Sequence, residues 1–191
     1  MATKAGERKL QILQVIAEML ETPQGEKVTT AALAARLEVS EAALYRHYAS
    51  KAQMYEGLIE FIENSVFSVI NQIEQDEENG MKQAELIVAS LLRFAQKNRG
   101  LTRVLIGDAL VHENARLQVR INQLMERIEA SLKQALRVAS TQGALPAEHD
   151  FGAHANTLVA YTLGRWHLFV KSGFKHEPLT QLPAQWAILK A

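Results

Sequence analysis

The sequence contains no cysteine, and this absence removes several kinds of site from consideration. Disulfide bonds and thiolate metal sites are excluded, and cysteine usage gives no argument for secretion. An excess of one charge is also missing, because 21 basic and 21 acidic residues give a formal net charge of +0. This balance argues against indiscriminate nucleic-acid binding. It averages over the surface, however, and leaves room for a local basic face.

Long hydrophobic runs are absent as well. The most apolar stretch reads LIVASLLRFA (residues 86–95) and has about half the length of a membrane span. The first ten residues, MATKAGERKL, have no apolar run after their basic residues, unlike a signal peptide. We therefore expect a cytoplasmic protein with no membrane segment.

The motifs of common catalytic sites are missing too: there is no Gly-Xaa-Ser-Xaa-Gly elbow, no phosphate-cradling glycine loop and no recognisable carboxylate pair. Six histidines invite a search for a metal site. His149 and His154 would lie about 140° apart on a helix, which makes them a poor pair of ligands. Asp150 and His154 have i,i+4 spacing, but no third ligand is evident. We expect no metal, no cofactor and no enzymatic activity.

Helical periodicity is what the sequence does contain, and no segment alternates convincingly like a strand. This predicts an all-α fold. We expect helices at residues 7–21, 30–37, 41–47, 51–75, 81–97, 101–111, 114–140 and 147–172, and a short one after Pro183. Pro23 and Gly25 are expected to end the first helix.

Apolar stripes mark the expected buried faces of the longer helices. In residues 7–21 the stripe consists of Leu10, Leu13, Ala17 and Leu20, widened by Ile12, Ile16 and Met19. In residues 51–75 it consists of Leu58, Ile62, Val66, Val69 and Ile73. In residues 114–140 the steps of three and four resemble a short coiled-coil seam, formed by Leu117, Ile121, Leu124, Ile128, Leu132 and Ala135.

Two short helices joined by three or four residues, at about residues 29–48, are typical of a helix-turn-helix motif. Apolar residues would hold the second helix at a fixed crossing and leave its other face free; they are Leu33, Leu37, Val39, Leu44 and Tyr48. The alternative interpretation is a plain αα-hairpin with a capping threonine and serine.

The free face carries the candidate contacts to DNA. Arg46 can bond guanine, Glu41 can accept from cytosine N4, and the small Ala42 and Ala43 can approach thymine methyl groups. Hydroxyls at a helix start can hold a phosphate, and Lys51 can bind another. The complete set expected to contact DNA is Thr29, Thr30, Ser40, Glu41, Ala42, Ala43, Tyr45, Arg46, His47 and Lys51.

The runs TTAALAARLEVS and EAALYRHYASKAQMYEGL (residues 29–58) resemble the N-terminal domain of TetR-type transcriptional regulators. The resemblance implies a three-helix helix-turn-helix domain at residues 1–50 and a helical dimerisation and partner-binding domain at residues 51–191. It also implies that the LYRHY segment belongs to the recognition helix and that Lys51 contacts the DNA backbone. Glu38 stands where the family commonly has Gly; a left-handed conformation there would cost about 1–2 kcal/mol. Ala49 replaces a frequent Pro.

The C-terminal part resembles a narrower group of this family, the nucleoid occlusion factors. The similar blocks are GLIEFIE (residues 57–63), GLTRVLIGDAL (100–110) and RLQVRINQLMERIEASLKQAL (116–136). The resemblance implies a homodimer on palindromic chromosomal sites, associated with the nucleoid, that blocks assembly of the tubulin-like division protein FtsZ. The alternative is a TetR-type repressor that responds to a small ligand.

Candidate contacts to FtsZ lie on two helices. Phe61 sits about 120° from the centre of the stripe in residues 51–75, among polar neighbours. It is either a second packing contact or an anchor for a partner protein. The full candidate set is Phe61, Arg93, Lys97, Asn98 and Arg99, and a solvated helix end is the plain alternative for the last four.

Dimerisation is expected through residues 114–140 and 147–172, paired with their twins as a four-helix bundle. This would place two recognition helices about 34 Å apart. The expected interface consists of Leu117, Ile121, Leu124, Ile128, Leu132, Tyr161, Trp166 and Phe169. The aromatic cluster Tyr161, Trp166, Phe169 and Phe174 is more typical of helical core than of a ligand pocket.

Overall fold

The computed structural model describes residues 5–22 and 28–190, which form helices and no strand. The elements are α1 (Ala5–Glu21), α2 (Thr30–Arg36), α3 (Glu41–Tyr45), α4 (Lys51–Asp76), α5 (Gly80–Lys97), α6 (Arg99–Leu105), the 3₁₀ turn η1 (Asp108–Leu110), α7 (Ala115–Thr141), α8 (Phe151–Lys171) and α9 (Leu182–Leu189). The predicted all-α fold is confirmed. Pro23 and Gly25, the expected end of the first helix, lie outside the described residues.

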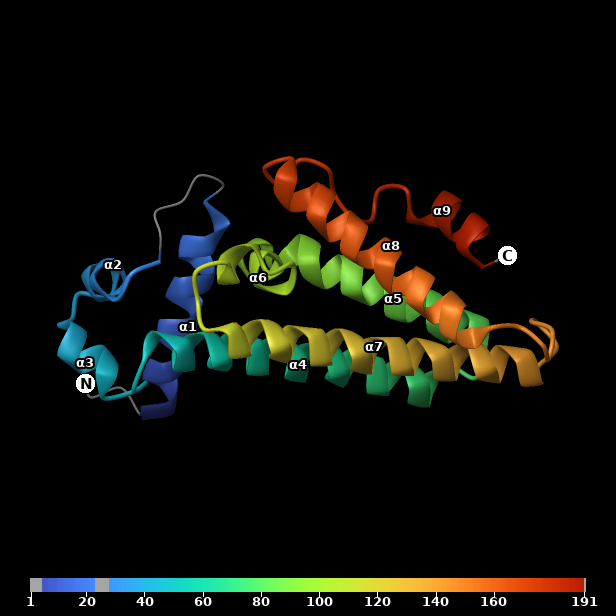
Figure 1. Cartoon of the computed structure of the whole chain (residues 1–191), viewed down its shortest axis with the longest axis horizontal. Helices are drawn as coiled ribbons and strands as arrows, with labels where there is room; N and C mark the ends of the chain where they lie inside the picture. The colour runs from blue at the N-terminus through green and yellow to red at the C-terminus, as the bar shows by residue number, and fades with distance from the viewer. Residues whose placement is uncertain (1–4, 23–27, 191) are drawn as a thin grey trace.

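The helices form an elongated molecule with α1, α2 and α3 at one end (Figure 1). From there α4 and α7 run along the long axis, and α7 packs against α5 and α8 as well as α4. Helix α1 packs against α4 and α6, which joins the first three helices to the rest. One hydrophobic cluster extends without a break from Ile12 in α1 to Trp186 in α9.

Side-chain caps explain where most of these helices begin. A side-chain oxygen of the preceding residue accepts a backbone N–H of the first turn, as is usual for Ser, Thr, Asp and Asn at this position. The capping residues are Thr29, Ser40, Ser50, Asn79, Asn114 and Asp150. Because Asp150 caps α8, this helix begins at Phe151, later than the predicted residue 147.

Glu38 follows the C-cap of α2 and has φ 53°, so it adopts the left-handed conformation for which related proteins commonly use glycine. Its N–H donates to the carbonyl of Ala35 at 3.2 Å, and the N–H of Val39 donates to that of Ala34 at 3.0 Å. This pair of bonds is the Schellman arrangement, which normally places glycine where Glu38 stands. The turn between α2 and α3 therefore keeps its geometry despite the glutamate.

The predicted single helix at residues 101–111 is wrong. The helix α6 ends at Leu105, Gly107 turns the chain with φ 78°, and η1 follows. The positive φ favours glycine there, whereas the nearest atom to an added Cβ, Oε1 of Gln118 at 2.6 Å, is the end of a flexible side chain that can move away. The break sets the link between η1 and α7 near the start of α4, where Lys51 and Glu113 meet.

Two predicted buried positions are exposed. Leu10 of α1 has 47% of its surface free, and Val69 of α4 is also exposed. On α4 the buried stripe runs instead through Ile59 and Ile70, while Val69 shares the side of Phe61 eight residues earlier. In both cases the structure exposes an apolar side chain that the sequence pattern assigned to the core.

The predicted dimer interface is wrong for most of its members. The α7 seam from Leu117 to Leu132 is at most 2% exposed within the single chain, and Trp166 and Phe169 are 1% exposed. Side chains without free surface cannot contact a second copy. The buried members are Leu117, Ile121, Leu124, Ile128, Leu132, Trp166 and Phe169.

The aromatic residues of α8 are part of this core, as the sequence favoured. The indole N–H of Trp166 donates to the carbonyl of Leu91 at 3.3 Å, and the rings of Phe169 and Phe174 are 5.1 Å apart. Tyr161 remains partly exposed, and its hydroxyl donates to Oε1 of Gln185 at 2.7 Å, which ties α9 to α8.

Candidate DNA-binding and partner surfaces

The short helix α3 presents one face to the core and the other to solvent, as the helix-turn-helix pattern predicted. Leu44 is buried together with Leu33 and Leu37 of the preceding segment. On the opposite side the exposed residues are Glu41, Ala42, Tyr45 and Arg46, while Ala43 and His47 are partly exposed. The face therefore offers an arginine, a carboxylate and small side chains for base contacts.

Hydroxyl groups line the start of α2 and α3, and each already has a partner. Oγ1 of Thr29 accepts the N–H of Ala32 at 3.1 Å, and Oγ of Ser40 accepts that of Ala43 at 3.3 Å. The hydroxyl of Thr30 donates to Oε2 of Glu41 at 2.5 Å. This last bond joins α2 to α3 through Oε2 of Glu41, so the carboxylate can keep Thr30 and accept from a base through Oε1.

Lys51, the predicted phosphate contact, forms an ion pair that the sequence did not indicate. Its Nζ lies 2.5 Å from Oε1 of Glu113, and the two side chains are only 24% and 13% exposed. The ammonium also lies 5.6 Å from the ring centre of Tyr55. Burial raises the pKa of Tyr55, and the negative charge of Glu113 adds to the shift. The partners are 62 residues apart in the chain, so no local pattern could have found them.

An open groove of about 530 Å³ lies between α1, α4 and the start of α6. Its α1 wall includes Leu10, Leu13 and Ala17, which is the stripe that the sequence assigned to the core. Phe61, 44% exposed, lines the groove from α4, and Asn98 lines it from the α5–α6 junction. Glu18 and Glu21 add acidic groups to the lining.

The predicted FtsZ contacts are only partly brought together. Phe61 and Asn98 share the groove, whereas Arg93 and Lys97 are exposed one turn apart on α5. Arg99 points elsewhere, because its guanidinium lies 5.8 Å from the ring centre of Phe174 after α8. Asn98 is also engaged at the helix end, where its side-chain N–H donates to the carbonyl of Phe94 at 2.8 Å.

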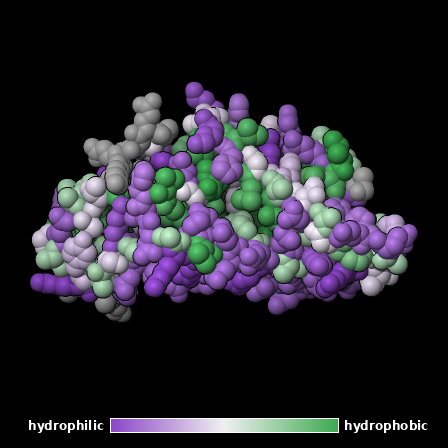
Figure 2. Space-filling view, in the orientation of Figure 1, coloured by the Kyte–Doolittle hydropathy of each residue, from purple (hydrophilic) through white to green (hydrophobic). Residues whose placement is uncertain are grey.

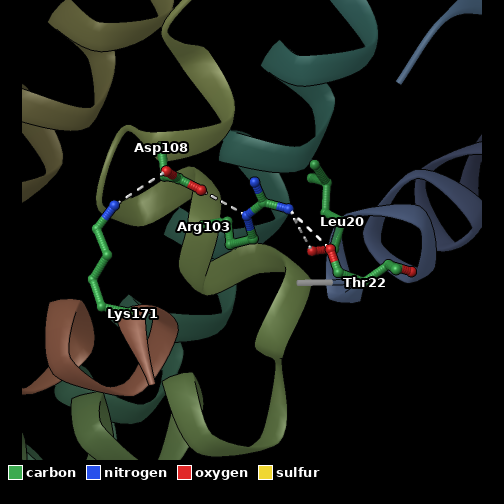
Figure 3. A network of polar contacts seen from close by, with 5 residues as sticks. All are labelled: Leu20, Thr22, Arg103, Asp108 and Lys171. Carbon is green, nitrogen blue, oxygen red and sulfur yellow. Dashed lines mark hydrogen bonds and ion pairs between the residues drawn. The ribbon is translucent and has the colours of Figure 1, made fainter. Parts of the chain in front are cut away.

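A polar network around Arg103 holds the far end of α1 (Figure 3). In this view Arg103 points toward the carbonyls of Leu20 and Thr22 on one side and toward Asp108 on the other. Its Nη1 donates to the two carbonyls at 3.2 and 3.3 Å, and its Nε lies 2.7 Å from Oδ2 of Asp108. Lys171 at the end of α8 approaches the same carboxylate at 3.9 Å. One carboxylate thus links α1, through Arg103, to the end of α8.

The two histidines considered as metal ligands are in contact, contrary to the helical estimate. His149 precedes α8, so the angle of a shared helix does not apply to it. Its Nε2 lies 2.9 Å from Nδ1 of His154, whose Nε2 is 2.7 Å from the carbonyl oxygen of Leu189. Within residues 5–22 and 28–190, no three histidine or acidic side chains are grouped to hold a metal ion. None of the described helices has the length and apolar character to cross a membrane.

Comparison with known proteins matches both ends of the chain. Residues 12–58 match the family described as bacterial regulatory proteins of the tetR family, and residues 78–191 match the tetracyclin repressor-like C-terminal domain. The nucleoid occlusion factor SlmA of Alteromonas mediterranea is 48% identical over 99% of this chain and 97% of its own length. The SlmA of Shewanella baltica is 49% identical over 96% of this chain and 93% of its own.

Solved structures with low sequence identity share the fold. The regulator FadR from Bacillus subtilis, solved with stearoyl-CoA, superposes with a TM-score of 0.77 at 14% identity, covering 95% of this chain and 97% of FadR. AibR, solved in complex with isovaleryl coenzyme A and operator DNA, superposes with a TM-score of 0.68 at 16% identity, covering 92% of this chain and 98% of AibR. The chain therefore belongs to the SlmA family of nucleoid occlusion factors, which is built on the fold of the TetR-type DNA-binding regulators.

Proposed function

We propose that this protein binds palindromic chromosomal sites as a homodimer and, from there, blocks FtsZ assembly over the nucleoid. The observation that carries this proposal is the groove that α1 of the DNA-binding end shares with α4 and α6. A partner seated in it would touch the helix-turn-helix unit and the long helices together. The near full-length similarity to SlmA proteins supports the same function.

At the DNA end, we assign base reading to the exposed face of α3. Arg46 would bond guanine, and Glu41 would accept from cytosine through Oε1 while Oε2 keeps its bond to Thr30. Backbone contacts are assigned to the residues around this face, namely Thr29, Thr30, Ser40, Tyr45, His47 and Lys51. Ala42 and Ala43 permit close approach to the bases.

At the partner surface, we assign the anchor role to Phe61. Its exposed ring lies beside the apolar α1 wall, so a hydrophobic side chain of FtsZ could be buried between them. Arg93 and Lys97 would supply positive charge next to the contact. Arg99 is the weakest of the assigned residues, because it already lies against Phe174.

For the dimer, we assign the outward side of α8 in place of the buried seam of α7. The exposed residues there include Ala160 and Gly164, which allow close approach, and Leu168, which is 53% exposed; polar residues such as Thr157 and His167 are exposed beside them. Figure 2 views the face on which α7 and α8 lie, where hydrophobic residues gather across the middle above a hydrophilic lower edge. Pairing through this face would still build a four-helix bundle.

The test is FtsZ sedimentation with this protein, with and without a palindromic duplex selected from a random pool. We expect the duplex to increase the inhibition of FtsZ assembly, because DNA fixes α1 and therefore one wall of the groove. Phe61→Ala should remove the inhibition while DNA affinity stays unchanged. Ile188→Ala, which truncates an exposed residue of α9 away from the groove, is the control.

Three results would contradict the proposal in different ways. Loss of DNA binding together with FtsZ inhibition in Phe61→Ala would indicate a structural role for the ring. Equal inhibition with and without duplex would refute the coupling. No effect on FtsZ under either condition would favour the alternative, a repressor that responds to a small ligand.

A further inference from the structure

The ion pair between Lys51 and Glu113 joins the start of α4 to the link between η1 and α7. Lys51 is the first residue of α4 and follows the exposed face of α3 by a few residues. Glu113 is held by local structure, because its N–H donates to the carbonyl of Leu110 at 2.9 Å and the next residue, Asn114, caps α7. The carboxylate is therefore presented to Lys51 by an ordered backbone.

A carboxylate held in this way occupies the kind of position that a DNA phosphate would need. Both groups accept charge-assisted hydrogen bonds from an ammonium. We propose that Glu113 is an internal competitor for DNA phosphate at Lys51, and that Lys51 exchanges Glu113 for a phosphate when the protein binds DNA. This inference rests on the proposed DNA binding and identifies a residue outside the helix-turn-helix motif that sets its strength.

The competition matters because the helix-turn-helix segment and the start of α4 contain few cations. Between residues 28 and 58 the basic residues are Arg36, Arg46 and Lys51, and the acidic ones are Glu38, Glu41 and Glu56. Sequence-independent affinity for DNA comes mainly from cations that neutralise phosphates. Glu113 neutralises one of these three cations, so a DNA complex that uses Lys51 either breaks the pair or brings a phosphate close to the carboxylate of Glu113.

Partial burial makes this pair stronger than an ordinary surface pair. The two side chains keep 24% and 13% of their surface, so water and salt screen them less than they screen exposed charges. We therefore expect that loss of the pair raises DNA affinity by about three- to tenfold, the range of a modest charged interaction.

The experiment measures binding of a fluorescein-labelled palindromic duplex, selected with the wild-type protein, and of a random-sequence duplex by fluorescence anisotropy. Glu113→Gln removes the charge and keeps the size of the side chain. Glu113→Asp keeps the charge but withdraws the carboxylate by one methylene, which separates loss of the contact from loss of charge. Both variants should bind either duplex more tightly, and thermal melts followed by circular dichroism check that they fold.

Two further variants show whether the effect passes through Lys51. In a Lys51→Gln background, Glu113→Gln should no longer raise affinity, because there is no ammonium to release. Glu38→Gln is the matched control: it removes one negative charge from the α2–α3 turn, where Glu38 is exposed, and should change affinity much less.

Other results would overturn the proposal that Glu113 competes with phosphate for Lys51. Weaker binding by both Glu113 variants would mean that Glu113 positions Lys51 for DNA, and would overturn the proposal. An equal gain in DNA affinity in Glu38→Gln would show that overall charge causes the effect, and would overturn the proposal too. If the wild-type protein bound no duplex at all, the proposed function would fail together with this inference, whereas wild-type binding with unchanged Glu113 variants would refute the inference alone.

Discussion

At the scale of single residues, Glu38 combines a strained backbone with an exposed side chain. Its φ of 53° belongs to the left-handed region, where a Cβ crowds the following carbonyl. The turns at Gly107, after α6, and at Gly143, after α7, use glycine for the same sign of φ. The α2–α3 turn is thus held by its two backbone hydrogen bonds and by the packing of Leu37 and Val39 against the core, in spite of its sequence.

Glu38→Gly should stabilise the protein by about 1 kcal/mol, because relief of the strain exceeds the larger entropy that glycine loses on folding. Urea denaturation followed by circular dichroism measures the free energy of unfolding. Glu38→Ala, which removes the same side chain but keeps the Cβ, should show little gain. Equal stabilisation by both variants would assign the effect to the carboxylate instead of the backbone.

His154 is buried between His149 and the last turn of α9. Because a carbonyl oxygen only accepts, Nε2 of His154 donates to Leu189, which leaves Nδ1 to accept from Nε2 of His149 in the neutral form. Burial lowers the pKa of His154, and the nearby His149 lowers it further, although the bond to Leu189 opposes the shift. The folded protein therefore holds this ring neutral at pH values where the unfolded chain would protonate it.

Stability should consequently fall as the pH drops below about 6.5, the usual pKa of a histidine in the unfolded chain. The folded state then binds fewer protons than the unfolded state, so acid favours unfolding until the pH passes below the lowered pKa. Urea denaturation between pH 7.5 and pH 5, compared with His154→Gln, measures the contribution. Parallel pH profiles for the two proteins would rule out His154 as its source.

At the scale of elements, the contact between α1 and α6 depends on one glycine. A Cβ on Gly100 would lie 1.9 Å from the carbonyl oxygen of Ala17, a distance that no side-chain movement can relieve because both atoms belong to backbone-fixed positions. Arg103, one turn further along α6, binds the carbonyls at the end of α1. Gly100 therefore brings the two helices together, and Arg103 fixes how far α1 extends along α6.

Gly100→Ala should destabilise the protein by about 3 kcal/mol or more, because α1 and α6 must separate to admit the methyl group. The same change should alter the groove, which Gly100 also lines. Thermal melts and FtsZ sedimentation together test both effects. Gly6→Ala is the control, since a Cβ there meets nothing within 4 Å, and it should be neutral or slightly stabilising.

The elements themselves could be predicted from sequence, but the surfaces between them could not. Capping residues such as Thr29, Ser40 and Asp150 mark helix starts locally, so most boundaries are found within a few residues. Periodicity likewise finds an apolar stripe, but it does not say what covers the stripe. Leu10 and Leu13 belong to a helical stripe and line an open groove, because α6 packs further along α1.

The same limit explains the errors in the dimer surface and the missed ion pair. The α7 seam repeats like a coiled coil, yet α4, α5 and α8 of the same chain fill the space beside it. Whether a stripe meets its own chain or a twin depends on the arrangement of distant helices. The pairing of Lys51 with Glu113 depends on where Gly107 turns the chain, which no pattern around residue 51 contains.

At the scale of the whole molecule, the proposed dimer forms through the exposed face of α8. Leu168→Glu should convert the dimer to a monomer, because a carboxylate buried at a helix–helix contact without a partner is strongly unfavourable. Sedimentation velocity at micromolar concentration measures the change. Ile188→Glu places the same charge on the exposed side of α9 and should leave the dimer intact. A dimer in both variants would assign pairing to another face.

The uninterrupted core means that the DNA-binding end is not a detachable module. Tyr55, Leu58 and Ile59 at the start of α4 are buried with α1 on one side and with the helices of the C-terminal part on the other. A graft of the first four helices onto a foreign body would expose these side chains, and α1 would lose the glycine against which it rests. A functional chimera would therefore need to carry α6 with the graft or to match its surface residue by residue.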